Sequence, residues 1–455
     1  MAARKPRFSV DAVFGIAVIL SYIIGQVVIG SYDPGDGRLH FDAPSDLDFL
    51  YYAGIIEQMK HDFPPQNPAY GGVPLSQSFV QYYPTAAAAL VVNPYLAMRI
   101  LNLVYVLLLA MVLRRYFPRG WGVGLAMTAA GSVGFGLINA LSVDLVARGF
   151  NHFPFFIAFV IALFEERNEW LRYGALFLLG WLHSFLALQA LLLYGGLVLF
   201  DRFSRRRIVD ALICLAGVVS AASITLGVAD KPFYFPFVEG FRFDVTDLWM
   251  HAVAPLALAA AARNVRIIML TAVAVLFGMF FHYNPFFPVF MLYFAAGWAG
   301  MELFAQGGYR FVVTAVACAL FVGFVFSAVG KYNPGKGNFV PFTNDPYFAA
   351  GRWLEANSAP GAVLLTAPLE SDKQCRLIET RAVYLGFIPH VAHLGIDWRV
   401  RAQKILSYYR QPAVYMAEID YIVYGPVERK LFPDFRLGGD PIFRDASVTI
   451  WKSQR

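Results

Sequence analysis

Long apolar runs dominate the first 330 residues of the chain. Crossing the hydrocarbon of a bilayer takes about 17–25 apolar residues in a helix, and several runs are shorter than that. The short runs between 152 and 183 are expected to be tilted, broken or re-entrant. The pattern predicts a polytopic α-helical membrane protein of about 11 spans, at roughly 10–30, 95–114, 121–140, 152–164, 170–183, 185–200, 208–228, 250–262, 266–282, 285–302 and 310–330.

Composition supports this fold class. Of the 455 residues, 58% are hydrophobic and 15% are charged, whereas soluble domains carry about 25% charged residues. The net charge of +6 is spread over loops, and we find no basic run with interleaved aromatic residues. Nucleic acid is therefore not expected as a partner. The first apolar run is long and lacks a small-x-small cleavage site, so it is predicted to remain as a span.

Lys and Arg fall in every second loop between the predicted spans. Because positive loops stay in the cytoplasm, the N-terminus is predicted to lie inside, in a cytoplasmic (inner) membrane. The opposite, periplasmic or extracellular side then receives 31–94, 141–151, 229–249 and the tail. The basic residues that set this orientation are Arg4, Lys5, Arg7, Arg114, Arg115, Arg119, Arg167, Arg172, Arg202, Arg205, Arg206, Arg207, Arg263, Arg266 and Arg310.

The tail, 331–455, has a different pattern from the membrane module 1–330. Runs of strand length alternate with helix-like segments, which predicts a small C-terminal α/β soluble domain outside the membrane. The strand-like runs are 362–366, 382–385 and 421–424, and the helix-like segments are 347–356 and 398–409. Basic residues of the tail are expected to form a solvated face near anionic headgroups: Lys331, Lys336, Arg381, Arg399 and Arg401.

The outer loop 31–94 contains the stretch APSDLDFLYYAGIIEQ, 43–58. Apolar residues recur there at helical spacing, which predicts an amphipathic helix near 46–60 with its apolar face in lipid or against the bundle. Two acids, Asp46 and Asp48, open it. Ser45 with Asp48 three residues later fits a capping-box-like helix start. A structural cap and a catalytic carboxylate are both open for this pair.

The order of features in this loop resembles the GT-C superfamily of integral-membrane glycosyltransferases. An acid follows the first span, then an aromatic helix, the Pro-rich FPPQNPAYGGVPL (63–75), and SFVQYYP (78–84) before an apolar helix. In the tail, WLEANSAPGAVLLTAP (353–368), TRAVYLG (380–386) and IDYIVYGPVERK (419–430) resemble the outer domain of uncharacterised bacterial and archaeal GT-C-like proteins. Neither GxGxxG nor a P-loop is present.

The resemblance implies a glycosyltransferase of cell-envelope glycan biosynthesis. It implies transfer of a sugar from a polyprenyl-(di)phosphate donor to an acceptor on the outer face, with inversion and with a first-loop acid as base. Asp48, followed by Tyr51 and Tyr52, best matches the acid-x-x-Tyr-Tyr pattern of the family, and Asp46 is the alternative. The acceptor, whether glycan, lipid or protein, is open. A base near the interface also suits an inverting attack by a hydroxyl group.

Further candidates lie in the other outer loops and at span ends. In 141–152, Asp144 would contact the acceptor or a metal, and Arg148 would contact the lipid phosphate. Alternatively, the two residues simply form an i, i+4 ion pair. His152 and His183 are substrate-binding or packing residues. Lys231 and Arg242 would bind phosphate or anchor their loop. A divalent metal stays open, since HExxH is absent and the histidines are scattered, and no other cofactor is expected.

Two other functions are left open by the sequence. A transporter or flippase of a lipid-linked sugar would need ionisable residues in mid-span, and few are present. A non-catalytic membrane assembly factor would use the outer domain to bind a partner. The glycosyltransferase remains the favoured interpretation.

Overall fold

The computed structural model divides into two compact units. The first, here called the bundle, comprises Met1–Ile29, Arg99–Ala221 and Phe235–Asn333; the second, the sheet unit, comprises Gly30–Met98, Ala222–Tyr234 and Pro334–Arg455. The structure describes residues 9–453 except 25–31, 34–37, 40–46, 76–78, 131–152, 166, 201–202, 227–244, 281–285, 332–344, 368–374, 387, 389–390, 392–395 and 413–415.

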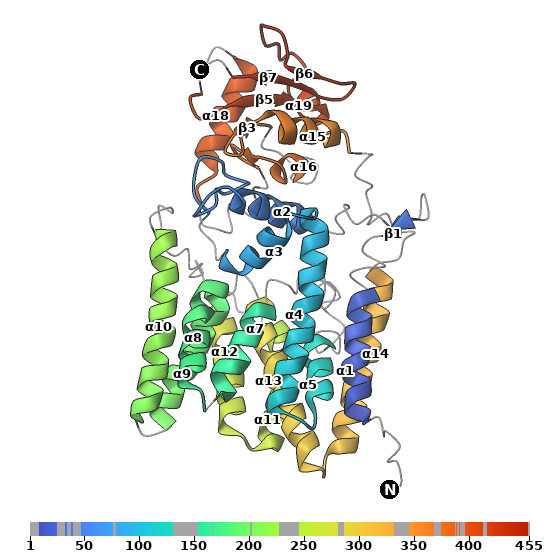
Figure 1. The fold of residues 1–455 in the computed structure, drawn as a ribbon, viewed down its shortest axis with the longest axis vertical. Helices are drawn as coiled ribbons and strands as arrows, with labels where there is room; N and C mark the ends of the chain where they lie inside the picture. The colour runs from blue at the N-terminus through green and yellow to red at the C-terminus, as the bar shows by residue number, and fades with distance from the viewer. Residues whose placement is uncertain are drawn as a thin grey trace. The chain divides into compact units, whose positions relative to one another are not determined.

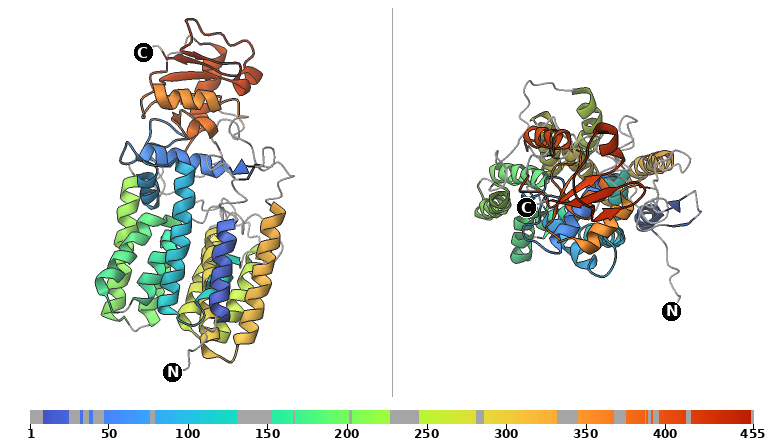
Figure 2. Two further views of the ribbon diagram at one scale, coloured as in Figure 1. Left: turned by 45° about the vertical axis from the view of Figure 1, so that its right-hand side comes forward. Right: turned by 90° about the horizontal axis from the view of Figure 1, so that it is seen from above.

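Helices that run roughly along a common axis make up the bundle (Figures 1 and 2). Each predicted apolar run overlaps one of them. By length and composition, only α4 among the described residues is long and apolar enough to cross a membrane, so the number of spans remains a prediction. The helices are α1 Val10–Ile23, α4 Pro94–Tyr116, α5 Trp121–Ala130, α7 Phe153–Phe164, α8 Glu169–Leu182, α9 Ser184–Phe200, α10 Arg205–Leu226, α11 Val245–Ala262, α12 Val265–Phe280, α13 Phe286–Gln306 and α14 Arg310–Lys331.

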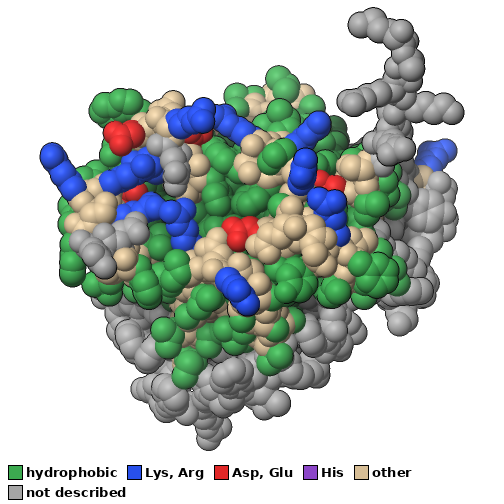
Figure 3. All heavy atoms as spheres, turned by 90° about the horizontal axis from the view of Figure 1, so that it is seen from below, with side chains coloured by type: hydrophobic (Ala, Val, Ile, Leu, Met, Phe, Trp, Pro, Cys, Tyr) green, Lys and Arg blue, Asp and Glu red, His purple; other side chains and the backbone are tan. Residues whose placement is uncertain are grey.

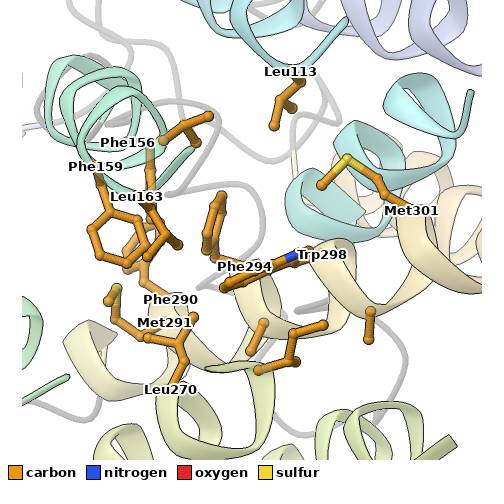
Figure 4. Packing of buried hydrophobic residues seen from close by; sticks show 14 of the residues in the cluster. Leu113, Phe156, Phe159, Leu163, Leu270, Phe290, Met291, Phe294, Trp298 and Met301 are labelled. Carbon is orange, nitrogen blue, oxygen red and sulfur yellow. The ribbon is translucent and has the colours of Figure 1, made fainter. Parts of the chain in front are cut away.

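Helix α13 lies at the centre of the bundle, against α5, α11 and α12. Figure 4 shows aromatic rings of α7 facing those of α13. Phe294 lies 5.4 Å from Phe156 and 5.4 Å from Phe159, and Trp298 lies 4.7 Å from Phe164, between ring centroids. Offset and edge-to-face pairs of this kind add to the free energy gained by burying the rings.

Polar contacts gather at the arginine-rich end of the bundle. Asp11 of α1 accepts hydrogen bonds from the backbone N–H groups of Gly120 (2.9 Å), Gly122 (2.7 Å) and Val123 (3.2 Å), so a residue of α1 caps the start of α5. Figure 3 shows Lys and Arg side chains spread over this end around apolar ones. The predicted cytoplasmic loops therefore meet on one face of the bundle.

Outward-facing positions of the bundle are apolar at helical spacing. Helix α4 exposes one such stripe and α10 another. Large apolar surfaces of this kind are rare on soluble monomers. The exposed residues are Ile100, Val104, Leu107, Leu108 and Met111 on α4, and Ile208, Leu212, Leu215 and Val219 on α10.

A mixed five-stranded sheet forms the core of the sheet unit, in the order β4-β3-β5-β7-β6. Strands β4, β3 and β5 are parallel, and β7 and β6 follow antiparallel. The strand-like runs of the tail thus form a small sheet flanked by helices, and the place of this domain outside the membrane stays a prediction. The elements are β3 Val363–Leu365, β4 Ala382–Val383, β5 Tyr421–Tyr424, β6 Phe443–Arg444 and β7 Thr449–Lys452, with α15 Phe348–Asn357, α16 Cys375–Ile378, α18 Arg399–Arg410 and α19 Pro426–Leu431. A separate hairpin pairs β1 Tyr32–Asp33 with β2 Arg38–Leu39.

The predicted solvated basic face of the tail is wrong for two of its arginines. Arg381 is only 3% exposed and donates to the backbone carbonyls of Glu355 (3.0 Å) and Ser358 (2.9 Å), which closes the C-terminal end of α15. Arg401 is half-buried between aromatic rings, as described below. The side chain of Arg399 is 75% exposed, as expected. The side chain of Lys331 and all of Lys336 lie outside the described residues.

Candidate active site

One candidate catalytic acid, Asp48, belongs to α2, Leu47–Met59. Asp48 falls in the first turn of this helix, but its side chain lies outside the described part of the chain, as do Asp46 and Ser45. The acids therefore stay predictions. What the structure shows is how α2 itself is held.

Helix α2 is buried on nearly all sides. Tyr51, Ile55 and Ile56 are each 0% exposed, and the polar Gln58 is also buried. The sequence predicts one apolar face, yet both faces are covered, because α2 packs against α16 from the tail and against α3, Tyr83–Ala88. A helix covered in this way does not lay its side chains in lipid. Its polar end carries Glu57, which pairs with Lys60 at 2.5 Å.

Gly54 brings the backbone of α2 directly onto the tail. A Cβ atom at this position would lie 2.4 Å from the carbonyl oxygen of Ile378 and 2.9 Å from the Cβ of Pro68. Real Cβ atoms do not approach so closely, so any larger residue would push the helix away. The close packing of α2 against the tail therefore requires a glycine, which has no side chain, at this position.

The predicted substrate residues Tyr51 and Tyr52, both on α2, belong to an aromatic cluster. Their ring centroids are 6.0 Å apart, and Tyr52 stacks on Tyr82 of the short helix η3, Val80–Tyr82, at 5.6 Å. These contacts fix both rings relative to α3. A role in substrate binding remains a prediction for each.

The Pro-rich part of the first outer loop extends the sheet. Gly71 donates to the carbonyl of Val383 (2.7 Å), Val383 donates to that of Pro68 (2.9 Å), and Gly386 donates to that of Ala69 (2.9 Å). Residues 68–71 thus run along β4 as an additional edge segment. They cover an edge that would otherwise expose unpaired backbone groups.

Arg401 of α18 fastens this segment. Its guanidinium lies 3.6 Å from the ring centroid of Tyr70 and 4.3 Å from that of Tyr384. It also donates to the carbonyls of Gly71 (2.7 Å) and Tyr384 (2.6 Å). Stacking and charge-assisted hydrogen bonds act together here. The first outer loop and the tail are therefore one folded unit that holds α2.

The carboxyl ends of β3 and β5, where an α/β sheet usually binds ligands, are filled by the protein itself. Glu428, 0% exposed, accepts from Tyr347 Oη (2.7 Å) and from the backbone N–H groups of Ala367 (2.8 Å) and Gly425 (2.9 Å). Burial and the neighbouring carboxylate raise the pKa of Tyr347, which keeps its hydroxyl a donor. This cluster is a structural lock.

Most of the other predicted site residues cannot be placed. Asp144, Arg148, His152, Lys231 and Arg242 lie outside the described residues.

His183 is the exception. It follows α8, and its Nδ1 accepts a hydrogen bond from the N–H of Leu186 at 3.4 Å, which caps α9. That contact leaves the proton of a neutral ring on Nε2, where it is a donor.

Two polar residues of α4 were not singled out by the sequence. Arg99 is 5% exposed and Asn102 is 0% exposed. Neither amide atom of Asn102 has a hydrogen-bond partner in the described structure. The predicted span 95–114 contains both residues, but one charge and one amide in an apolar run have no spacing that indicates a site. No group of three or more His, Cys, Asp or Glu able to hold a metal occurs among the described residues.

Known structures share this architecture. ArnT from Cupriavidus metallidurans, bound to undecaprenyl phosphate, is 13% identical and superposes with a TM-score of 0.52 over 97% of each chain. The same protein in its apo state is 12% identical, with a TM-score of 0.51 over 97% of each chain. The chain therefore shares the fold of ArnT. The resemblance to GT-C proteins predicted from the sequence is thus confirmed for the fold. No protein-family model and no curated protein matches the chain.

Proposed function

We propose that this protein is an integral-membrane glycosyltransferase that uses a polyprenyl-(di)phosphate-linked sugar. The observation that carries the proposal is a GT-C fold over 97% of the chain, combined with an acid in the first turn of α2. GT-C folds can host more than one activity, so the acid at this place is what makes transfer chemistry the favoured function.

The apolar surface of the bundle supports its location in a membrane. Helix α4 has 23 residues, or about 34 Å of helix, and the hydrocarbon core of a bilayer is about 30 Å thick. Its outward stripe is apolar, and its last turn carries Arg114 and Arg115. We place that end in the cytoplasm. The other end of α4, the first outer loop and the tail then lie on the outer face.

The reaction needs a base beside the acceptor and donors beside the leaving phosphate. As the acceptor oxygen attacks the anomeric carbon, its proton passes to a carboxylate and the bond from carbon to phosphate oxygen breaks, with inversion. Asp48 is the proposed base, and Asp46 is the alternative. The proposed substrate contacts are Tyr51, Tyr52, Asp144, Arg148, His152, His183, Lys231 and Arg242.

Substitution of the acids tests the proposal. In the full chain, reconstituted in proteoliposomes with a polyprenyl-linked sugar, Asp48→Asn should lower turnover by about 10²–10⁴-fold, the usual contribution of a general base. Asp46→Asn is measured in parallel. Asp62→Asn is the matched control, because Asp62 is exposed and lies just beyond the helix. Its turnover should equal that of the parent.

Two results would overturn the assignment. Full turnover in both acid variants would exclude either residue as the base. Movement of the lipid-linked sugar across the membrane without bond formation would show a transporter instead. Thermal unfolding of each variant is followed by tryptophan fluorescence, so that loss of activity is not confused with loss of fold.

A further inference from the structure

Arg99 and Asn102 lie on one buried face of α4, opposite its lipid-facing stripe. Residues three apart are neighbours on a helix surface, and both side chains are buried while Ile100 and Val104 are exposed. From Pro94, the start of α4, Arg99 lies about 8 Å along the helix axis and Asn102 about 12 Å. Both residues thus lie in the half of the helix that is farther from Arg114.

The surroundings of this face change along α4. The main apolar cluster of the bundle includes Leu109, Ala110 and Leu113 of α4. Asn102 precedes these three residues on α4, on the side toward Pro94. Its side-chain amide is fully buried, and neither of its polar atoms has a hydrogen-bond partner among the described residues. An amide left unpaired within hydrocarbon costs free energy. Such a group in a native structure calls for a missing partner, such as a ligand or water.

Other buried arginines serve the fold. Arg172 and Arg207 contact Asp210 at 2.9 Å and 3.5 Å, at the opposite end of the bundle. Arg381 is engaged with backbone carbonyls of the sheet unit. Arg99 differs from these in its place: it is a buried cation in the outer third of a helix proposed to span the membrane. An ionisable residue at such a place is expensive to bury and is usually functional.

We infer that Arg99 and Asn102 bind the phosphate of the lipid-linked donor. A guanidinium presents paired N–H donors that match phosphate oxygens. The side-chain amide of Asn102 adds N–H donors for the oxygen atoms of the phosphate and a carbonyl acceptor for a hydroxyl group of the ligand. This inference rests on the proposed function, and it identifies where the leaving group would be held.

Direct binding tests the inference without turnover. Undecaprenyl phosphate is titrated into the full chain in detergent, and its stabilisation of the protein against thermal unfolding gives a Kd. Arg99→Gln should raise Kd by at least about tenfold, and Arg99→Lys, which keeps the charge, should raise it less. Arg114→Gln is the matched control, because it removes the same charge from the exposed end of the same helix. Its Kd should be unchanged.

Asn102→Leu separates a ligand contact from a structural role. Leu has a similar volume and removes the unpaired amide, so the ligand-free variant should unfold at the same temperature as the parent or higher. Its Kd for undecaprenyl phosphate should nevertheless rise by about two- to tenfold, the value of a neutral hydrogen bond. Parental binding in Asn102→Leu or in Arg99→Gln would overturn the inference.

Further outcomes separate this inference from the proposed function. If the parent binds undecaprenyl phosphate through Arg99 but transfers no sugar, the proposed function fails and the site stands. If the parent transfers sugar while Arg99→Gln binds the lipid normally, the site is wrong and the function stands. Inorganic phosphate is the second probe. Equal stabilisation by inorganic phosphate alone would show a site for free phosphate and refute the lipid assignment.

Discussion

Replacing Gly54 by Ala sets two effects of opposite sign against each other. In a helix interior, Ala is favoured over Gly by up to about 1 kcal/mol, through the entropy of the unfolded chain. At Gly54, however, the new methyl group would lie 2.4 Å from the carbonyl oxygen of Ile378. Relieving that contact requires α2 or the chain after α16 to move by about 1 Å. Overpacking of this kind costs about 1–3 kcal/mol, so the net effect should loosen α2 by about 0–2 kcal/mol.

Gly174 supplies the matched control. It also lies inside a helix, α8, but a Cβ atom there would meet nothing within 4 Å. Gly174→Ala should therefore stabilise the protein by up to about 1 kcal/mol. The same chemical change at the two positions differs only in what the new methyl group meets.

Hydrogen exchange of the α2 amides measures the loosening of this helix directly. Peptides that cover 50–60 should exchange faster in Gly54→Ala by up to about 30-fold, since 1.4 kcal/mol is a factor of ten. Gly174→Ala should leave these peptides unchanged. If Gly54→Ala protects α2 more than the parent does, the gain from alanine outweighs the contact with Ile378, and the reasoning is refuted.

Three further substitutions test the supports of the fold. Arg401→Ala should detach the segment beside β4 and speed exchange there, because it removes two charge-assisted hydrogen bonds of about 1.5–3 kcal/mol each; Arg401→Lys should rescue little, and exchange equal to the parent would contradict the clamp. Asp210→Asn removes the buried partner of Arg172 and leaves it, among the described acids, only the exposed Glu169 at 3.7 Å; it should destabilise the protein by about 3–5 kcal/mol, seen as a lower unfolding temperature. Asp11→Ala removes the cap of α5 and should cost about 0.5–2 kcal/mol; an unchanged unfolding temperature would show that the cap carries no stability.

Periodicity predicted the elements but not what covers them. The apolar runs were long enough to give each helix of the bundle, and β-branched or aromatic residues gave β3, β4 and β5. The strands β6 and β7 were not predicted. Strand β6 has only two residues, one of them Arg444, so it offers no alternation of apolar and polar residues to count. For α2, the pattern showed one apolar face. The second face is covered by α16, more than 300 residues away, and no local pattern shows a partner at that distance.

The candidate site, too, could be predicted only in part from the sequence. The resemblance to GT-C proteins identified the loop that carries the acids, because its order of acid, aromatic helix and Pro-rich segment is local. It did not indicate the role of Arg401, because Arg401 contacts Tyr70, which belongs to that loop and is distant in sequence. Nor did it indicate Asn102, since one amide in an apolar run has no spacing to interpret. Burial and missing partners, which only a structure gives, make Asn102 a candidate.

The division of the chain also bears on how the acids would be positioned. The sequence predicts a boundary near 330, with a tail that folds outside. In the structure, the sheet unit takes residues from before that boundary as well, Gly30–Met98, and the segment 68–71 covers the edge of β4. A tail expressed without the first outer loop would expose that edge, a known cause of aggregation. The first loop without the tail would lose the surface that buries α2. The two segments therefore depend on each other, and the tail acts as the rigid support of α2, whose first turn contains Asp48.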